Sequence, residues 1–377
     1  MTINIADPVI QSWWFFGLLA IVTLATTRYR PKFNPLDPKL TNQLKGWAIQ
    51  AVVFSHIGYF LINQHQFLQP ISFFAGVGVN LFLFLSGYGL AISGLKKPLS
   101  PLRFYQKRLT KLYLPMWISL IIFLFLDYWL LKLSYPSKTL IDSFLGYFPT
   151  ANLFTNINSP LWFFSLILIY YITFPWLFWK RLPWIYPVII IFGARWLLQQ
   201  TPPDDFKNLD LYLKHYLAFP LGVSTAILIM NRYIQKFFIF SLHLWNKINR
   251  YLQLILRIIV ILIVTIIFHY QAIYSNVGTT PALEQQTSLI QMALLLILFW
   301  LIPLQIKLWE WLGEYSYEIF LLHWPILARY EFLYRFIPAS MATFIYLWLF
   351  LGISYALDWI INQLTGSKKL FLRIFRQ

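Results

Sequence analysis

Apolar residues fill most of the chain in long blocks separated by short polar segments. The block 258–268, for example, contains no charged side chain, and none of the blocks shows the alternation typical of a membrane β-strand. Blocks of this length predict membrane-spanning helices. We expect eleven, at residues 10–27, 46–62, 73–95, 112–131, 160–179, 182–198, 211–230, 252–269, 288–306, 317–334 and 340–362.

The composition supports this interpretation. Of 377 residues, 59% are hydrophobic and only 11% are charged, and a soluble domain of this length could not bury so much apolar surface. The predicted class is therefore an all-α polytopic membrane protein. Cysteine is absent, which excludes disulfides and thiolate metal ligands, and we expect no metal site.

The net charge of +17 comes from lysine and arginine gathered on one side of the threaded chain. Alternate segments contain 22 of these residues, whereas the opposite segments contain four, Lys132, Lys138, Lys207 and Arg335. The positive-inside rule places the rich segments in the cytoplasm. We expect an inner-membrane protein with its N-terminus outside and its C-terminus cytoplasmic, in contact with lipid and not with nucleic acid.

The first predicted helix is distinct from the rest. No basic region precedes it and no small-residue cleavage site follows, so it is expected to remain as an anchor. The proline-rich stretch "RYRPKFNPLDPKL" after it is typical of a linker. We therefore divide the chain into residues 1–41, a membrane domain at 42–365 and a basic tail at 366–377.

An imidazole stands inside the second predicted helix, in "LKGWAIQAVVFSHIGYF". Polar groups inside a bilayer are costly and indicate function, although a hydrogen-bonded structural histidine is the alternative. His56 follows Lys45 by eleven residues, which on a helix places both on one face, about 20° and about 16 Å apart. This spacing would suit a long anionic molecule lying along the helix, with Lys45 at the cytoplasmic rim and His56 near mid-membrane.

The third predicted helix, "GVGVNLFLFLSGYGLAISG", combines small residues that allow close helix packing with one strongly polar side chain. That side chain, Asn80, has an estimated depth close to that of His56. We expect it to hydrogen-bond either the His56 imidazole or an acceptor. The alternative is an ordinary interhelical hydrogen bond.

The segment "KKPLSPLRFYQKRLTKLYLPMW" contains six cations and no acid. Orientation in the membrane alone could explain it. However, Arg108 and Lys111 are three residues apart on one helix face, and such a pair can hold phosphates.

Two further segments contain candidate residues. Trp162 opens "LWFFSLILIYY", where an interfacial aromatic anchor is the simpler explanation. The segment "WLGEYSYEIFLLHWPILARYEF" places His323 among several charged residues and Pro325, which must kink the helix. A spanning helix this polar is expected to face a cavity.

Five motifs in this order resemble the acyltransferase-3 family of membrane proteins over residues 42–362. They are "LKGWAIQAVVFSHI", "GVGVNLFLFLSGYGL", "RFYQKRLTKLYLPMW", "PLWFFSLILIYY" and "LGEYSYEIFLLHWPIL". The resemblance implies a core of about ten helices, to which the first helix is an addition. It also implies transfer of an acyl group, most often acetyl, from cytoplasmic acyl-CoA to an extracytoplasmic or lipid-linked glycan.

The resemblance also implies roles for individual residues. His56 corresponds to the catalytic histidine, and Asn80 lies at a second catalytic position. The CoA phosphates would be bound by Lys45, Arg103, Arg108 and Lys111. The pocket would include Ser86, Trp162, Tyr317 and His323. Lys45 and Lys111 replace arginines of the family pattern, Asn80 replaces an aspartate, and the helix after Trp162 lacks an acid found in some branches.

A glycan O-acyltransferase is therefore the expected function, with acetyl-CoA as co-substrate and no tightly bound cofactor. A transporter or glycan exporter is the alternative from another class, although no inverted repeat is visible, and a structural membrane partner is a third. The acceptor sugar, the choice between acetyl and succinyl, direct or covalent transfer, and the oligomeric state stay open at this point.

Overall fold

The computed structural model describes residues 3–30, 38–61, 66–69, 71–152, 156–200 and 207–365. The predicted basic tail, 366–377, lies outside these residues. The α-helices are α1 (Pro8–Ala25), α2 (Pro38–Gly58), α3 (Ala75–Lys96), α4 (Pro101–Leu131), α5 (Ser137–Leu145), α6 (Trp162–Leu177), α7 (Ile185–Leu197), α8 (Leu209–Leu213), α9 (Ala218–Met230), α10 (Arg232–Lys247), α11 (Arg250–Ile273), α12 (Pro281–Leu301), α13 (Lys307–Glu314), α14 (Ser316–Arg329) and α15 (Ala339–Leu364).

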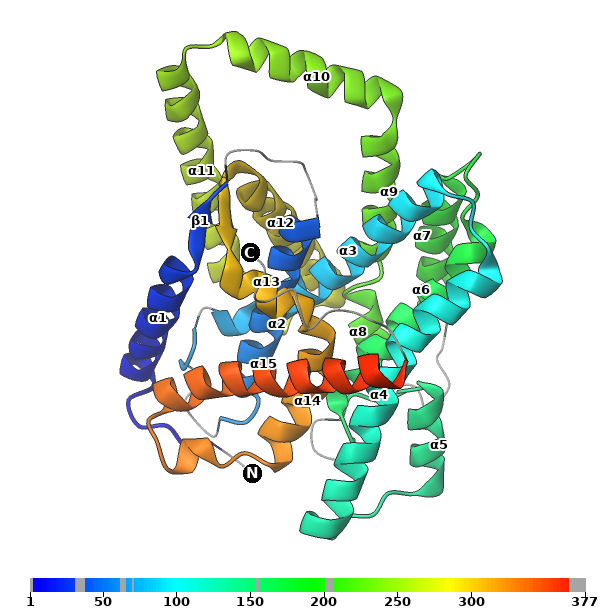
Figure 1. Cartoon of the computed structure of the whole chain (residues 1–377), viewed down its shortest axis with the longest axis vertical. Helices are drawn as coiled ribbons and strands as arrows, with labels where there is room; N and C mark the ends of the chain where they lie inside the picture. Colours follow the sequence, from blue (N-terminus) through cyan, green and yellow to red (C-terminus); the bar gives the residue numbers. More distant parts are fainter. Residues whose placement is uncertain are drawn as a thin grey trace.

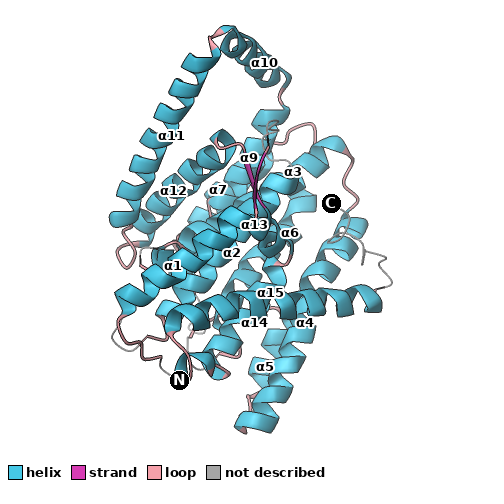
Figure 2. Ribbon diagram, turned by 60° about the vertical axis from the view of Figure 1, so that its left-hand side comes forward, coloured by secondary structure: helices cyan, strands magenta, loops and turns pink. Residues whose placement is uncertain are grey.

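Short elements complete the fold (Figures 1 and 2). Three 3-10 turns are η1 (Ile71–Phe73), η2 (Ser159–Leu161) and η3 (Leu333–Arg335). Strands β1 (Thr27–Tyr29) and β2 (Leu304–Ile306) form one antiparallel pair. The predicted all-α polytopic class is confirmed.

Eight helical segments of the described chain are long and apolar enough to cross a membrane. They are Pro8–Ala25, Ala75–Lys96, Pro101–Leu131, Ser159–Leu177, Leu209–Met230, Arg250–Ile273, Pro281–Leu301 and Ala339–Leu364. The predicted spans 182–198 and 317–334 correspond to the shorter helices α7 and α14. The span predicted at 46–62 belongs to α2, which starts earlier, at Pro38, and ends earlier, at Gly58.

Helix α1 contacts the rest of the chain near both of its ends. Near its start, the Ser12 hydroxyl accepts a hydrogen bond from the Leu68 amide at 2.8 Å, and the Phe15 ring meets Phe54 of α2 edge-on. At its other end, β1 pairs with β2. The first helix is therefore packed onto the bundle rather than standing apart from it.

Glycines allow two pairs of helices to touch backbone to backbone. A Cβ on Gly46 of α2 would overlap the Trp309 carbonyl of α13, and one on Gly313 of α13 would overlap the Asn42 carbonyl of α2. Likewise, a Cβ on Gly87 of α3 would overlap the Phe219 carbonyl of α9, and one on Gly222 of α9 would overlap the Phe84 carbonyl of α3. The close packing predicted for the third helix is confirmed at Gly87, and it places α9 directly against α3.

A buried carboxylate ties α4 to α14. Asp127 is 0% exposed, and its oxygens accept hydrogen bonds from Arg329 Nε at 2.8 Å, from the Tyr330 hydroxyl at 2.6 Å and from the Tyr135 hydroxyl at 2.7 Å. Arg329 also donates to the Ile157 carbonyl, just before η2. Because these three donors pair the Asp127 carboxylate, its charge is tolerated in the apolar interior. Removing Asp127 or Arg329 would leave the other ion there without its counter-ion.

We expect Asp127→Asn to destabilise the protein by roughly 3 to 5 kcal/mol, because the Arg329 charge would lose its counter-ion while still buried. The measurement is the thermal unfolding midpoint of the purified protein in detergent. Asp142→Asn, a half-buried acid in α5, is the matched control and should shift the midpoint little. Equal midpoints for Asp127→Asn and the wild type would refute the structural role of this network.

Candidate functional site

Two imidazoles meet where α2 and α14 come together. His56 Nδ1 and His323 Nε2 are 2.7 Å apart, and the two rings are stacked with their planes 7° from parallel. His323 is fully buried, whereas His56 is half-buried. His56 therefore keeps some exposed surface, and His323 has none.

Helix α2 places His56 differently from the sequence prediction. The predicted span runs to residue 62, whereas the helix ends at Gly58, so His56 is in its last turn. Just beyond the helix, the Phe60 carbonyl accepts a hydrogen bond from the Ile3 amide, which pairs the N-terminal segment with this part of the chain. His56 thus lies at the end of α2 opposite Lys45, eleven residues away.

The proton positions follow from the second hydrogen bond of His323. Its Nδ1 lies 3.0 Å from the Ile319 carbonyl oxygen, which can only accept, so Nδ1 carries a proton. A second proton would make a charged ring in a fully buried position, which is costly. His323 Nε2 is therefore an acceptor, His56 Nδ1 donates to it, and the lone pair of His56 is on Nε2.

Pro325 shapes the backbone that holds His323. Proline has no amide hydrogen, so the carbonyl of Leu321, four residues earlier, lacks its usual helical partner. The side-chain amide of Asn158 donates to that carbonyl at 2.8 Å. Asn158, just before η2, therefore pairs the carbonyl that the kink in α14 leaves free, and it fixes the turn from which His323 projects.

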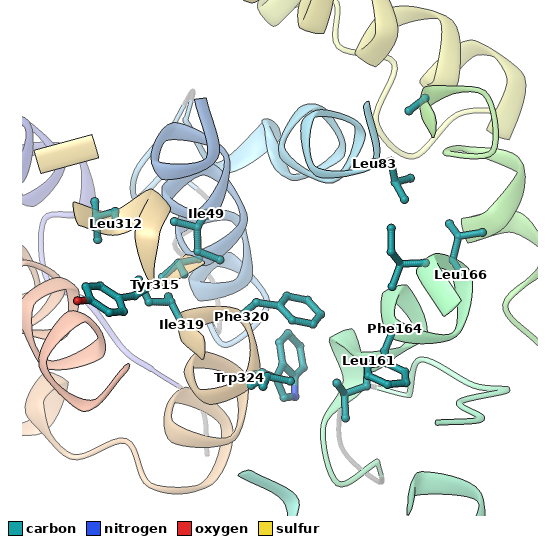
Figure 3. Packing of buried hydrophobic residues seen from close by; sticks show 14 of the residues in the cluster. Ile49, Leu83, Leu161, Phe164, Leu166, Leu312, Tyr315, Ile319, Phe320 and Trp324 are labelled. Atoms are coloured by element: carbon teal, nitrogen blue, oxygen red, sulfur yellow. The ribbon is translucent and has the colours of Figure 1, made fainter. Parts of the chain in front are cut away.

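Aromatic and aliphatic side chains enclose the pair. The edge of Trp324 meets the His56 ring at 5.0 Å between centroids, and the indole lies between Phe320 and Leu161 (Figure 3). Within the described part of the chain, the Trp324 indole nitrogen is buried and has no hydrogen-bond partner, and the same is true of the Ser55 hydroxyl. Unpaired polar groups in a buried position are costly, so the Trp324 N–H beside His56 could donate to a polar ligand group.

Asn80 contacts a different imidazole from the one expected. Its carbonyl oxygen lies 2.8 Å from His215 Nδ1, and its amide donates to the Ser288 hydroxyl at 2.8 Å. Both ends of the amide are thus engaged by helices other than α2, because α3 turns Asn80 toward the α8–α9 junction and α12. A hydrogen bond from Asn80 to His56 is not found, and the interhelical alternative describes the observed contacts.

The sequence analysis did not include His215 among the candidate site residues. The signal was the same as for His56, an imidazole within an apolar span, in "YLKHYLAFP". Its ring stacks on the indole of Trp162, with centroids 5.5 Å apart. Trp162 is therefore engaged with this second histidine.

Lys45, in the first half of α2, lies near enough to Arg108 of α4 for their charges to interact. Lys45 precedes the predicted span, and burial lowers its pKa, with a further lowering from the positive charge of Arg108. Both side chains are half-buried, and their like charges repel each other. A bound anion would relieve that repulsion, so this pair is a candidate phosphate site.

The remaining predicted residues fall into two groups. Arg103 and Lys111 are on α4 with Arg108, but their side chains are exposed. Ser86 and Tyr317 are engaged inside the bundle: the Ser86 hydroxyl lies 2.9 Å from the Tyr171 hydroxyl, and Tyr317 donates to the Leu112 carbonyl at 2.6 Å. Among the described residues, no cluster of three or more histidines and acids could hold a metal ion.

These features define a polytopic membrane protein with two basic side chains near the first half of α2 and a histidine pair at its last turn. The family model described as an acyltransferase domain, acyltransferase-3, matches residues 41–359, and the chain belongs to that family. Helix α1 lies outside the matched region. No curated protein and no solved structure matches the chain.

The tautomers can be checked by ¹⁵N NMR of selectively histidine-labelled protein. We expect His56 to show a protonated Nδ1 and an unprotonated Nε2, because His323 Nε2 offers only a lone pair. His323→Gln identifies the His323 signals by their loss, and His269, which is exposed on α11, is a control that should show the usual mixture. Protonation of His56 at Nε2 would contradict the assignment.

Proposed function

We propose that this membrane acyltransferase transfers an acetyl group from cytoplasmic acetyl-CoA to a hydroxyl of an extracytoplasmic or lipid-linked glycan, with His56 as general base. The observation that supports this most is the His56–His323 pair, which leaves a lone pair on His56 Nε2. The charge distribution of the sequence supports an inner membrane with the basic segments in the cytoplasm.

The proposed reaction begins when His56 Nε2 removes the proton of the acceptor hydroxyl. The oxygen attacks the thioester carbonyl carbon, a C–O bond forms, and the carbonyl oxygen becomes an oxyanion. When the oxyanion collapses, the C–S bond breaks, and the CoA thiolate takes the proton from His56. The products are the acetyl ester and free CoA, and His56 returns to its starting tautomer.

The neighbours of His56 have distinct parts in this scheme. His323 is a positioning residue: it accepts the His56 Nδ1 proton in a hydrogen bond and would stabilise the transient imidazolium. The unpaired Trp324 N–H is the candidate donor to the oxyanion. Direct transfer is the simplest course for this geometry, because a single lone pair suffices.

The donor would lie along α2. Lys45 and His56 are eleven residues apart on one continuous helix, which corresponds to about 16 Å. Phosphates held by Lys45 and Arg108 would leave the thioester arm to extend toward His56. The glycan, the choice of acetyl over other acyl groups and the use of CoA belong to this proposal.

We expect His56→Ala to lower acyl transfer per folded molecule by roughly 100- to 10,000-fold, the usual contribution of a general base. Acetyl-CoA affinity, measured on the same purified sample, should change little. His215→Ala is the matched control for a buried histidine and should lower the yield of folded protein more than turnover. Near-normal transfer by folded His56→Ala protein would assign the chemistry to another group.

Free CoA release separates the proposed reaction from transport. Membranes containing the wild type should release CoA from acetyl-CoA when a glycan acceptor is present, whereas a transporter or exporter would not. His56→Ala membranes are the matched blank. Failure of the wild type to release CoA with every acceptor tested would overturn the proposed activity.

We expect Lys45→Ala with Arg108→Ala to weaken acetyl-CoA binding by roughly 2 to 4 kcal/mol, since each cation would supply a charge-assisted contact. The exposed pair Arg103→Ala with Lys111→Ala removes the same charge from the same face of the protein and should weaken binding much less. Binding is measured by calorimetry on purified protein. Equal losses in the two double variants would contradict a localised site.

The lowered pKa of Lys45 also predicts a pH dependence. Phosphate binds the charged amine, so donor affinity should be full below the pKa of Lys45 and decline as the pH rises through it. Lys45→Arg should keep its affinity to higher pH, because a guanidinium stays charged. Lys111→Arg is the control and should leave the profile unchanged. A wild-type profile that is flat up to the ordinary range of lysine would refute the role of Lys45.

A further inference from the structure

Between the predicted spans 211–230 and 252–269 the structure has a regular helix, α10, Arg232–Lys247. Its basic side chains lie along one narrow stripe. At about 100° per residue, they fall within about 60° of one another around the helix axis. They are Arg232, Lys236, His243 and Lys247, and the helix contains no acid.

Large apolar side chains project into open space beside this stripe, and the exposed Ile239 lies at its edge, about 20° from Arg232. The exposed fractions are 81% for Tyr233, 67% for Phe237 and 59% for Phe240, and Leu244 is also exposed. By the same helical geometry these four lie about 80° to 140° from Arg232, beside the basic stripe. A basic stripe bordered by an uncovered aromatic surface is typical of a helix that lies in a membrane interface.

Amide side chains fix both ends of α10. At its start, the Asn231 side chain accepts from the Tyr233 amide at 2.9 Å, and Gln235 donates to the Ile229 carbonyl of α9. At its end, Gln253 of α11 donates to the Trp245 and Ile248 carbonyls. Helix α10 thus connects the segments Leu209–Met230 and Arg250–Ile273, which are both long and apolar enough to span a membrane. Figure 1 shows α10 between α9 and α11.

The packing of α9 identifies the side of the bundle on which α10 lies. Asn80 near the start of α3 contacts His215 just before α9, and Gly87 further along α3 contacts Phe219 within α9. The two helices therefore run in the same direction, and α10 follows α9 at the end where α3 finishes in Lys96. This is the lysine-rich end of the molecule, which the positive-inside rule assigns to the cytoplasm.

We propose that α10 lies in the headgroup layer of the cytoplasmic leaflet, where its aromatic surface enters the lipid and its basic stripe binds anionic phospholipids. The two spanning segments hold α10 at the level of the membrane surface. Over about 24 Å, this helix presents basic side chains and no acidic one. Lipid phosphates complement this charge, and the bilayer covers the aromatic side chains. This proposal stands apart from the acyl transfer reaction.

The absence of cysteine from the chain allows the depth of α10 to be measured. Single-cysteine variants Phe240→Cys and His243→Cys, each with an environment-sensitive fluorophore, are reconstituted as the full chain in phosphatidylcholine and phosphatidylglycerol. We expect brominated lipid to quench the probe at 240 and iodide to quench the probe at 243. Iodide quenching of both would place α10 in the solvent and overturn the proposal, as would protection of both from either quencher, which indicates a protein cover.

Anionic selectivity is tested separately. Nanodiscs of mixed phosphatidylcholine and phosphatidylglycerol are prepared with Lys236→Gln/Lys247→Gln and with the matched control Lys132→Gln/Lys207→Gln from the opposite side. Spin-labelled phosphatidylglycerol should lose about tenfold or more in association with the first variant, as expected for two cations near a charged surface, and little with the control. Equal association in the two variants would overturn the assigned lipid charge.

Discussion

The hydrogen bond between His56 and His323 joins residues that are 267 positions apart, and the arrangement of the site depends on it. It fixes the tautomer of the half-buried His56 ring, because the fully buried His323 ring already donates its only proton to a backbone carbonyl. It also brings together the last turn of α2 and the middle of α14. A lone imidazole in either helix could adopt either tautomer, whereas the pair has one consistent arrangement.

An apolar interior imposes the same requirement on every other polar group in the bundle. Pro325 leaves the Leu321 carbonyl without a helical partner, and Asn158 supplies one. Asp127 is buried with one cation and two phenols around it, and Asn80 is held between His215 and Ser288. The groups that lack a partner therefore stand out, and the Trp324 indole beside His56 is one of them.

Much of the architecture could be read from the chain because bilayer-length apolar blocks and lysine placement obey local rules. The class of the protein, the family and the close packing at Gly87 follow from such patterns and are confirmed. The position of His56 along its helix was predicted less well. A hydropathy window does not resolve the point where a helix ends, and the structure shows that α2 ends at Gly58, with His56 in its last turn.

The sequence by itself determined which residue types are available for chemistry and their spacing along one helix, as for Lys45 and His56. Tertiary structure decided which of them meet. Asn80 and His56 have similar estimated depths, but depth does not specify the direction in which a side chain points, and α3 turns Asn80 toward His215. Likewise, Arg108 and Lys111 are equivalent in the sequence pattern, yet Arg108 is half-buried and its charge acts on Lys45, whereas Lys111 is exposed. A hydrophobic pattern specifies a helix face but not its neighbour.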